Sequence, residues 1–330
     1  MKFPSVEPLA GPTMNIFLTS AYDSHACLDA LRANAALAIS GRHVLGDSPE
    51  EADAILFVEN THFDDLRWTR LLRDPLLRRF REKSFVYNES DKPWDVLAGL
   101  YCSLTAPLFE PTRHVAFPYL GAYNEQVRDV HASDVERRWL FSFVGAMSHS
   151  CRRSILALQH SDALVRDTSG FDVWHAPAEE RDVRARQFAD VLAASRFVLC
   201  PRGIGTSSLR LFETMQAGRA PVIIADEWLP PPHVDWSFAL RVSERDIASV
   251  PALLVARADE AEERGRVARA AWEASYAPEM LFDTVCDSIE YLLTGERGKR
   301  RHPYRSGIRK WLLSGEAVTR QTMRLLRRVA

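Results

Sequence analysis

Strand-length apolar runs alternate with helical stretches along this chain, and the alternation restricts the folds that the chain can adopt. The helical stretches include a basic one interrupted at Pro75, and the pattern is helical from about Ile247 to Leu293. Strands that alternate with helices at this spacing predict parallel βαβ units. The strand-length runs are MNIFLTS at 14–20, ADAILFVEN at 52–60, KSFVYN at 83–88, VAFPYLG at 115–121, WLFSFVG at 139–145, FVLC at 197–200 and APVII at 220–224.

A polar stretch at 124–138, NEQVRDVHASDVERR, separates two such sets and marks a domain boundary. A chain of 330 residues is long enough for two domains, each with its own core. We therefore expect an α/β fold with two Rossmann-like parallel-sheet domains that face a central cleft, followed by a helical C-terminal region. Ligands of such folds lie at the carboxyl ends of the strands. The predicted domains are an N-terminal one at 1–133, a C-terminal one at 134–296 and a basic tail at 297–330.

The composition is typical of a globular protein, with 46% hydrophobic and 26% charged residues. The sequence contains no run of eighteen apolar residues, and its first residues lack the apolar core of a secretory signal. Five scattered cysteines argue against a disulfide framework and suit a reducing compartment. We therefore expect a cytoplasmic protein.

The positive charge is concentrated in the tail. Residues 297–330 hold eleven Lys and Arg and one acid, whereas the other 296 residues hold 31 basic and 43 acidic residues. One interpretation is a helix that lies on an anionic membrane surface, which suits a peripheral enzyme at the inner membrane face. The other is a helix that packs on the acidic body. Binding to nucleic acid is disfavoured because the rest of the chain is acidic.

The segment FVLCPRGIGTSSLRLFETMQAG at 197–218 combines a strand, a glycine loop and a helix. The loop is neither a Walker A motif nor a complete dinucleotide fingerprint, since Ser208 stands where the third glycine belongs. Gly203 and Gly205 still allow the backbone to approach a ligand closely. Ser207 and Ser208 are placed to cap the helix, whose free N–H groups favour an anion. The alternative is an ordinary turn between strand and helix.

The helix after this loop is almost wholly apolar, and its charged residues Arg210 and Glu213 lie three residues apart. A buried carboxylate is costly unless another group satisfies it. One possibility is a salt bridge between these two residues. The other is a pair that faces the cleft, where Glu213 accepts hydrogen bonds from ribose hydroxyls while Arg202 or Arg210 neutralises a diphosphate.

The stretch FVLCPRGIGTSSLRLFETMQAGRAPVIIADEWLPP resembles the nucleotide-sugar half of the exostosin family of glycosyltransferases, in a short, bacterial-like form. LFSFVGAMSHSCRRSIL and FALRVSERDI are similar to flanking parts of that family. The resemblance implies a GT-B architecture and transfer of a sugar from a nucleotide sugar, usually UDP-linked, with inversion. It implies no tightly bound cofactor beyond this donor.

The resemblance also implies roles for single residues. Glu213 would hold the ribose, and Arg210 and Arg202 would serve the diphosphate. Gly145 would form the opposite wall, together with a basic side chain of the helix that follows, either Arg152 or Arg153. One departure concerns the glutamate that many GT-B enzymes carry eight residues before the ribose-binding one, because this chain has Gly205 there.

Inverting transfer needs a general base for the acceptor hydroxyl, and we expect it in the N-terminal half. Glu89 and Asp91 follow a predicted strand and are the candidates, although solvated turn acids are common before a proline. We expect no metal site, because no convincing D-x-D motif occurs and the pair of His149 and Cys151 lacks a third partner.

The sequence therefore predicts a hexosyl- or glycuronosyltransferase of polysaccharide biosynthesis. It would move a sugar from a nucleoside-diphosphate sugar to a glycan or lipid-linked acceptor. The alternatives are a nucleotide-sugar-binding protein without transferase activity and a structural α/β adaptor in which Arg210 and Glu213 form only a salt bridge.

Overall fold

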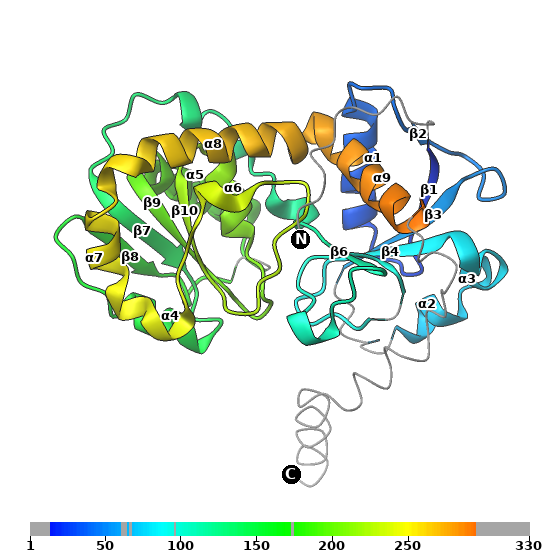
Figure 1. Ribbon diagram of the computed structural model, residues 1–330, viewed down its shortest axis with the longest axis horizontal. Helices are drawn as coiled ribbons and strands as arrows, with labels where there is room; N and C mark the ends of the chain where they lie inside the picture. Colours follow the sequence, from blue (N-terminus) through cyan, green and yellow to red (C-terminus); the bar gives the residue numbers. More distant parts are fainter. Residues whose placement is uncertain (1–13, 61–64, 66–67, 96, 173–174, 295–330) are drawn as a thin grey trace, which may run out of the picture.

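The computed structural model describes residues 14–60, 65, 68–95, 97–172 and 175–294 and shows two α/β units side by side (Figure 1). Each unit has its own parallel sheet. The basic tail predicted at 297–330 lies outside the described residues.

The first unit holds a six-stranded parallel sheet with the order β2-β1-β3-β4-β5-β6. The helix break predicted at Pro75 is confirmed, because Asp74 ends one helix and accepts hydrogen bonds from the N–H groups of Leu76 and Leu77 at the start of the next. The elements are β1 (Asn15–Thr19), α1 (Ala26–Leu37), β2 (Val44–Leu45), β3 (Ala54–Glu59), α2 (Thr69–Arg73), α3 (Pro75–Arg79), β4 (Ser84–Asn88), β5 (Gly99–Tyr101) and β6 (His114–Ala116).

The second unit holds a five-stranded parallel sheet with the order β11-β10-β9-β7-β8. The predicted helix end at Gly218 is confirmed by a φ of 64°, a left-handed conformation that glycine adopts at low cost. The elements are β7 (Trp139–Gly145), α4 (Ser150–Leu156), β8 (Ala163–Asp167), α5 (Ala178–Ala193), β9 (Ser195–Pro201), α6 (Leu209–Gln216), β10 (Ala220–Ile224), β11 (Leu240–Arg241), α7 (Val250–Val255), α8 (Ala261–Ser275) and α9 (Pro278–Thr294).

Short 3₁₀ turns complete the described structure, and several of them lie between β6 and β7, where the chain passes from one unit to the other. They are η1 (Arg81–Lys83), η2 (Ala106–Leu108), η3 (Leu120–Ala122), η4 (Glu125–Val127), η5 (Val130–Ala132), η6 (Trp236–Phe238), η7 (Glu244–Ser249) and η8 (Ala258–Glu260).

One apolar cluster contains residues of both units, and each unit also has a smaller cluster of its own. Helix α8 packs on α6 and β10 of the second unit, whereas α9 returns to the first unit and packs on α1 and β5 (Figure 1). The ring of Tyr276, between these helices, makes edge contacts with Phe117 of the first unit and Phe212 of α6, at centroid distances of 6.3 and 5.5 Å. The chain thus crosses twice between the units, and the boundary at 133/134 stays a prediction.

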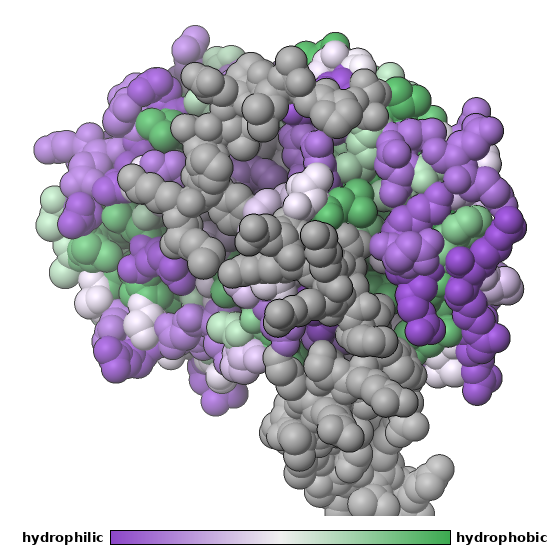
Figure 2. Space-filling model, turned by 45° about the vertical axis from the view of Figure 1, so that its right-hand side comes forward, coloured by the Kyte–Doolittle hydropathy of each residue, from purple (hydrophilic) through white to green (hydrophobic). Residues whose placement is uncertain are grey.

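The described helices include none that combines the length and hydrophobicity needed to cross a bilayer. On the face shown in Figure 2, hydrophilic side chains are spread over both units and apolar ones are interspersed among them.

A glycine on α8 sets how closely this helix approaches α6. A Cβ atom at Gly265 would lie 2.5 Å from the carbonyl oxygen of Gly218 and 3.2 Å from the Cα of Arg219. Both atoms belong to the backbone and cannot move aside without shifting the end of α6. Helix α6 carries Arg210 and Glu213, so this contact helps to position the residues of interest.

We expect Gly265→Ala to lower the melting temperature by several degrees. Alanine favours a helix over glycine by about 1 kcal/mol, but overpacking against a backbone costs about 1–3 kcal/mol, so the collision should outweigh the helix propensity. Thermal unfolding followed by circular dichroism tests this. Gly170→Ala is the control, because a Cβ at Gly170 meets nothing within 4 Å. An unchanged or higher melting temperature for Gly265→Ala would contradict the argument.

Candidate functional site

The glycine loop at 202–208 joins β9 to α6 and reaches the first unit. A Cβ atom at Gly205 would lie 2.8 Å from Oδ1 of Asp91 and 2.9 Å from Cβ of Ser103. Both residues follow strands of the first sheet, β4 and β5, so the carboxyl ends of strands from both units meet at this loop. A side chain at position 205 would require Ser103 and Asp91 to shift, so glycine suits this close approach.

Glu213 on α6 is half-buried, and its partner is a residue of the segment that connects the two units. Its Oε1 accepts a hydrogen bond of 2.8 Å from Nδ2 of Asn124. The amide of Asn124 is oriented because its Oδ1 accepts from the N–H of Gln126 at 3.0 Å. Burial raises the pKa of Glu213, while the bond from Asn124 and the charge of Arg210 oppose this rise.

The backbone of Asn124 is also bound to α6. Its N–H donates to Oε1 of Gln216 at 3.0 Å, and its carbonyl accepts from Nε2 of Gln216 at 2.9 Å. The connecting segment is therefore attached to α6 by three hydrogen bonds, one of which orients Glu213.

Arg210 does not pair with Glu213. Its guanidinium donates to the carbonyl of Val144 and lies 5.0 Å from the ring centroid of Phe143. No ion pair joins Arg210 to Glu213 among the described residues, so the salt bridge left open by the sequence is not formed. The Nε–H of Arg210 is buried without a hydrogen-bond acceptor among the residues that the structure describes, and burial lowers the pKa of Arg210.

Gly145 at the end of β7 gives Arg210 room. A Cβ atom there would lie 2.7 Å from a terminal nitrogen of Arg210. Gly145 and Arg210 are therefore neighbours, and the role of Gly145 in a phosphate wall with Arg152 or Arg153 stays a prediction.

Arg152 on α4 is buried and bonded to three backbone carbonyls, those of Ala146, Pro201 and Arg202, at 2.8, 3.3 and 2.9 Å. It thereby ties the end of β7 to the start of the glycine loop. Burial, and to a smaller extent the charge of Arg210, lowers its pKa to about 10. A Cβ at Gly203 would lie 3.2 Å from its guanidinium, whereas Arg153 on the same helix is exposed.

Arg202 lies at the start of the loop with long contacts to two acids. A terminal guanidinium nitrogen is 3.6 Å from a carboxylate oxygen of Glu227 and 3.9 Å from one of Glu244. The buried Nε–H of Arg202 has no acceptor in the described part of the chain. Within that part, Arg202 and Arg210 thus each keep one donor without a partner beside the glycine loop.

The two serines of the loop differ from the expectation. Ser208 occupies the N-cap position of α6, but its side chain makes no capping hydrogen bond. Ser207 is buried, and its N–H donates to Oγ of Ser103 in the first unit at 3.4 Å. The predicted serine cap at 208 is thus wrong, and Ser207 connects the two units.

The two candidate bases have different surroundings. The carboxylate of Glu89 accepts from the N–H of Leu120 and, at 3.1 Å, from the thiol of Cys27, and burial raises its pKa. Asp91 is half-buried, and its Oδ1 accepts from the hydroxyl of Tyr119 at 2.9 Å. Asp91 faces the glycine loop, whereas Glu89 holds the turn at η3.

His149, Cys151 and Glu244 each bring one ligand atom within 4.8 Å of the others. The pair of His149 and Cys151 therefore has a third partner, contrary to the sequence argument. Burial and the positive charges of Arg202 and Arg152 lower the pKa of His149. The same charges disfavour a cation and favour an anion, and the expectation of no metal site stays a prediction.

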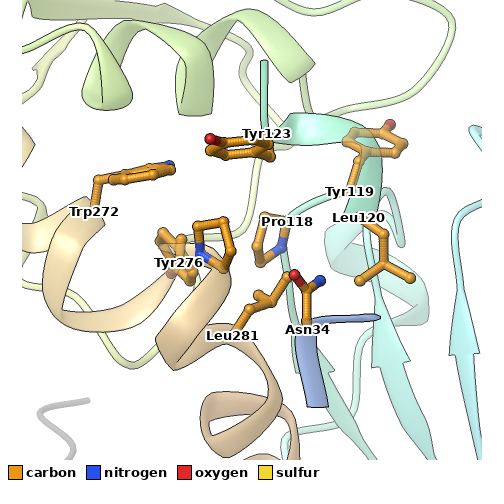
Figure 3. A pocket seen from close by; sticks show the side chains of 9 residues that line it. Asn34, Pro118, Tyr119, Leu120, Tyr123, Trp272, Tyr276 and Leu281 are labelled. Carbon is orange, nitrogen blue, oxygen red and sulfur yellow. The ribbon is translucent and has the colours of Figure 1, made fainter. Parts of the chain in front are cut away.

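A pocket lies between the two crossings of the chain (Figure 3). The rings of Tyr123 and Trp272 face it, nearly parallel at 19° with centroids 6.2 Å apart. Tyr119 lines the same pocket and, through its hydroxyl, contacts Asp91. The full lining is Asn34, Pro118, Tyr119, Leu120, Tyr123, Trp272, Tyr276, Pro278 and Leu281.

Ser103, Tyr119 and Asn124 were missed by the sequence analysis. Each is a single polar residue in an irregular segment with no motif around it. The contacts among these residues and with Asp91, Ser207 and Glu213 join positions 16 to 104 residues apart along the chain, so no local pattern signals them.

Comparison with known proteins gives matches of sequence and of fold. The sequence model of the Exostosin GT47 domain matches residues 77–256. The exostosin-1 homolog of Caenorhabditis elegans is 30% identical over 168 residues, which are 46% of this chain and 43% of that protein. A protein of Arabidopsis thaliana named as a probable glycosyltransferase is 25% identical over 154 residues, covering 46% of this chain and 28% of that protein. The alignment thus spans less than half of either relative.

Three solved structures align over most of the chain at low similarity. They are MurG of Acinetobacter baumannii (12% identity, TM-score 0.35, 79% of this chain and 77% of that one), a glycosyltransferase of Rickettsia africae (8%, 0.40, 86% and 100%) and an α1,3-fucosyltransferase (12%, 0.41, 89% and 93%). We take the architecture of two parallel-sheet units from the strand order above.

The match to the Exostosin GT47 domain includes β4 and β5 of the first unit and the sheet of the second unit. It covers more than half of the sequence. The chain therefore belongs to the exostosin GT47 family.

Proposed function

We propose that this chain is a glycosyltransferase that moves a sugar from a nucleoside-diphosphate sugar, with UDP as the expected nucleotide, to a glycan or glycolipid acceptor with inversion. The observation that carries this proposal concerns the hydrogen-bond partners of the charged residues on α6 and beside the glycine loop. Glu213 is held by Asn124 rather than by Arg210, and among the described residues two arginines beside the glycine loop each keep a buried donor without a partner.

Glu213 is suited to bind the ribose. Its Oε1 is bonded to Asn124, and among the described residues no hydrogen bond to Oε2 is formed. A carboxylate oxygen with free lone pairs accepts hydroxyl hydrogen bonds strongly because it is charged. The bond from Asn124 holds the side chain in one orientation before the donor arrives.

Arg202 and Arg210 are suited to the diphosphate. A buried donor left unpaired costs about 1–3 kcal/mol, and a diphosphate beside the loop would offset part of this cost through its charge on the two guanidinium groups. The N-terminus of α6 adds a positive dipole end near the loop. These groups would stabilise the negative charge that grows on the leaving diphosphate.

Asp91 is suited to act as the base. In a single displacement, the acceptor oxygen bonds to the anomeric carbon, the bond to the diphosphate breaks, and the hydroxyl proton passes to a carboxylate. Asp91 borders the glycine loop, whereas Glu89 is engaged by Leu120 and Cys27. We therefore assign the proton transfer to Asp91 and a structural role to Glu89.

The proposed acceptor and the proposed location of the enzyme are argued from the charge of the tail. The eleven basic residues of the tail would attract an anionic membrane surface, which suits a cytoplasmic enzyme that extends lipid-linked glycans.

Replacing Glu213 by alanine should weaken UDP binding by about 10- to 150-fold, because hydrogen bonds to a charged group contribute about 1.5–3 kcal/mol. Titration calorimetry with UDP measures this. Glu179→Ala is the control, because Glu179 is an exposed acid in the first turn of α5. If Glu213→Ala binds UDP as tightly as the parent, the ribose role is wrong.

Replacing Asp91 by asparagine should lower kcat at least about 100-fold while the affinity for UDP stays within a few fold, since a general base contributes about 10²–10⁴. The measurement is release of the nucleoside diphosphate, UDP from the UDP-sugars and GDP from the GDP-sugars of a donor panel. Glu89→Gln should instead lower the melting temperature. A parent chain that binds UDP but turns over no donor would favour the alternative of a binding protein without transferase activity.

A further inference from the structure

Three hydrogen bonds, made by side chains and one backbone N–H, form a continuous hydrogen-bond chain between the two units. The N–H of Ser207 lies 3.4 Å from Oγ of Ser103, which lies 2.6 Å from the hydroxyl oxygen of Tyr119. That hydroxyl lies 2.9 Å from Oδ1 of Asp91. The chain begins in the glycine loop of the second unit and ends at the carboxylate of the first.

The two end groups, the carboxylate of Asp91 and the N–H of Ser207, determine the direction of each bond in this hydrogen-bond chain. An ionised carboxylate only accepts, so the hydroxyl of Tyr119 donates its single proton to Asp91. The bond between Tyr119 and Ser103 is therefore donated by Ser103. Oγ of Ser103 then accepts from the N–H of Ser207, which can only donate. All donors point the same way, and bonds in such a chain polarise one another.

The surroundings keep this chain in place. Ser103 is 1% exposed and Ser207 is 5% exposed, so water competes little for these groups. Burial raises the pKa of Tyr119 well above its ordinary value, and its hydroxyl therefore stays a donor. Gly205 brings the loop backbone against both Ser103 and Asp91, so a shift of the loop necessarily changes the distances along the chain.

We propose that Ser103 and Tyr119 are positioning residues that couple the glycine loop to the carboxylate of Asp91. This inference rests on the proposed function, in which the loop borders the donor and Asp91 is the base. Tyr119 occupies Oδ1, which leaves Oδ2 as the atom that takes the proton of the acceptor hydroxyl. When the glycine loop contacts a bound nucleotide sugar, the hydrogen-bond chain thereby holds Asp91 in the orientation that the proton transfer needs.

A matched control lies in the same pocket. Tyr123 also lines it, but its hydroxyl accepts from Nε of Arg128 at 2.9 Å and has no connection to Asp91 (Figure 3). Tyr119→Phe and Tyr123→Phe remove the same atom from the same pocket, and only the first interrupts the chain.

The experiment compares Tyr119→Phe, Ser103→Ala, the double variant and Tyr123→Phe in the full chain. We expect Tyr119→Phe and Ser103→Ala each to lower kcat for donor turnover about tenfold or more, as expected for a displaced general base. The donor KM and the Kd of UDP should stay within about twofold. The double variant should lose no more than the larger single loss, because both changes interrupt one chain. Tyr123→Phe should retain the kcat of the parent.

Several results would overturn the inference. A kcat for Tyr119→Phe equal to that of Tyr123→Phe would do so, as would losses that multiply in the double variant. Equal losses of kcat and of UDP affinity would indicate a general structural role instead. If Tyr119→Phe fails to fold, Ser103→Ala tests the inference by itself. This variant removes only one buried oxygen and still interrupts the hydrogen-bond chain. A parent that binds no nucleotide and turns over no donor would refute the proposed function first, and that result is visible before any variant is made.

Discussion

The close approach of the glycine loop to the first unit is the contact on which the site depends. At Gly205 there is no room for a Cβ between the loop backbone, Asp91 and Ser103. Since β4, β5 and β9 all end at this point, one missing side chain allows two parallel sheets to bring their carboxyl ends together. Ligand-binding residues of α/β sheets gather at such ends. The contact therefore turns two separate sheets into one candidate site.

The second connection is Asn124, which lies between the units in sequence and is bonded to α6 in space. Its side chain orients Glu213 and its backbone is bonded twice to Gln216. Any movement of one unit against the other acts on this segment. A ligand held by Glu213 would therefore influence the arrangement of the units, and that arrangement would influence Glu213, because coupling of this kind is reciprocal.

Local patterns predicted most of the strands, the break at Pro75, the end of α6 at Gly218 and the family. They did not predict β2 and β11, which have two residues each, β5, which has three, or β8, whose residues are half-buried or exposed. The site was predicted less completely. Arg202, Arg210 and Glu213 lie together near the glycine loop, but Arg152 is bonded to three carbonyls and Arg153 is exposed. Ser103, Tyr119 and Asn124 depend on contacts between distant segments, which no local pattern encodes.

Burial opposes the charged forms of both Arg210 and Glu213, since it lowers the pKa of the first and raises that of the second. Two such groups three residues apart would relieve this cost most simply by pairing, yet each is directed to a neutral partner, Val144 and Asn124. The desolvation cost is thus only partly offset within the protein. A ligand that carries an anion and hydroxyl groups would offset it at both residues at once. Under the proposed function, the free energy not recovered by folding would be available for binding, which is the physical reason for proposing a nucleotide sugar at α6.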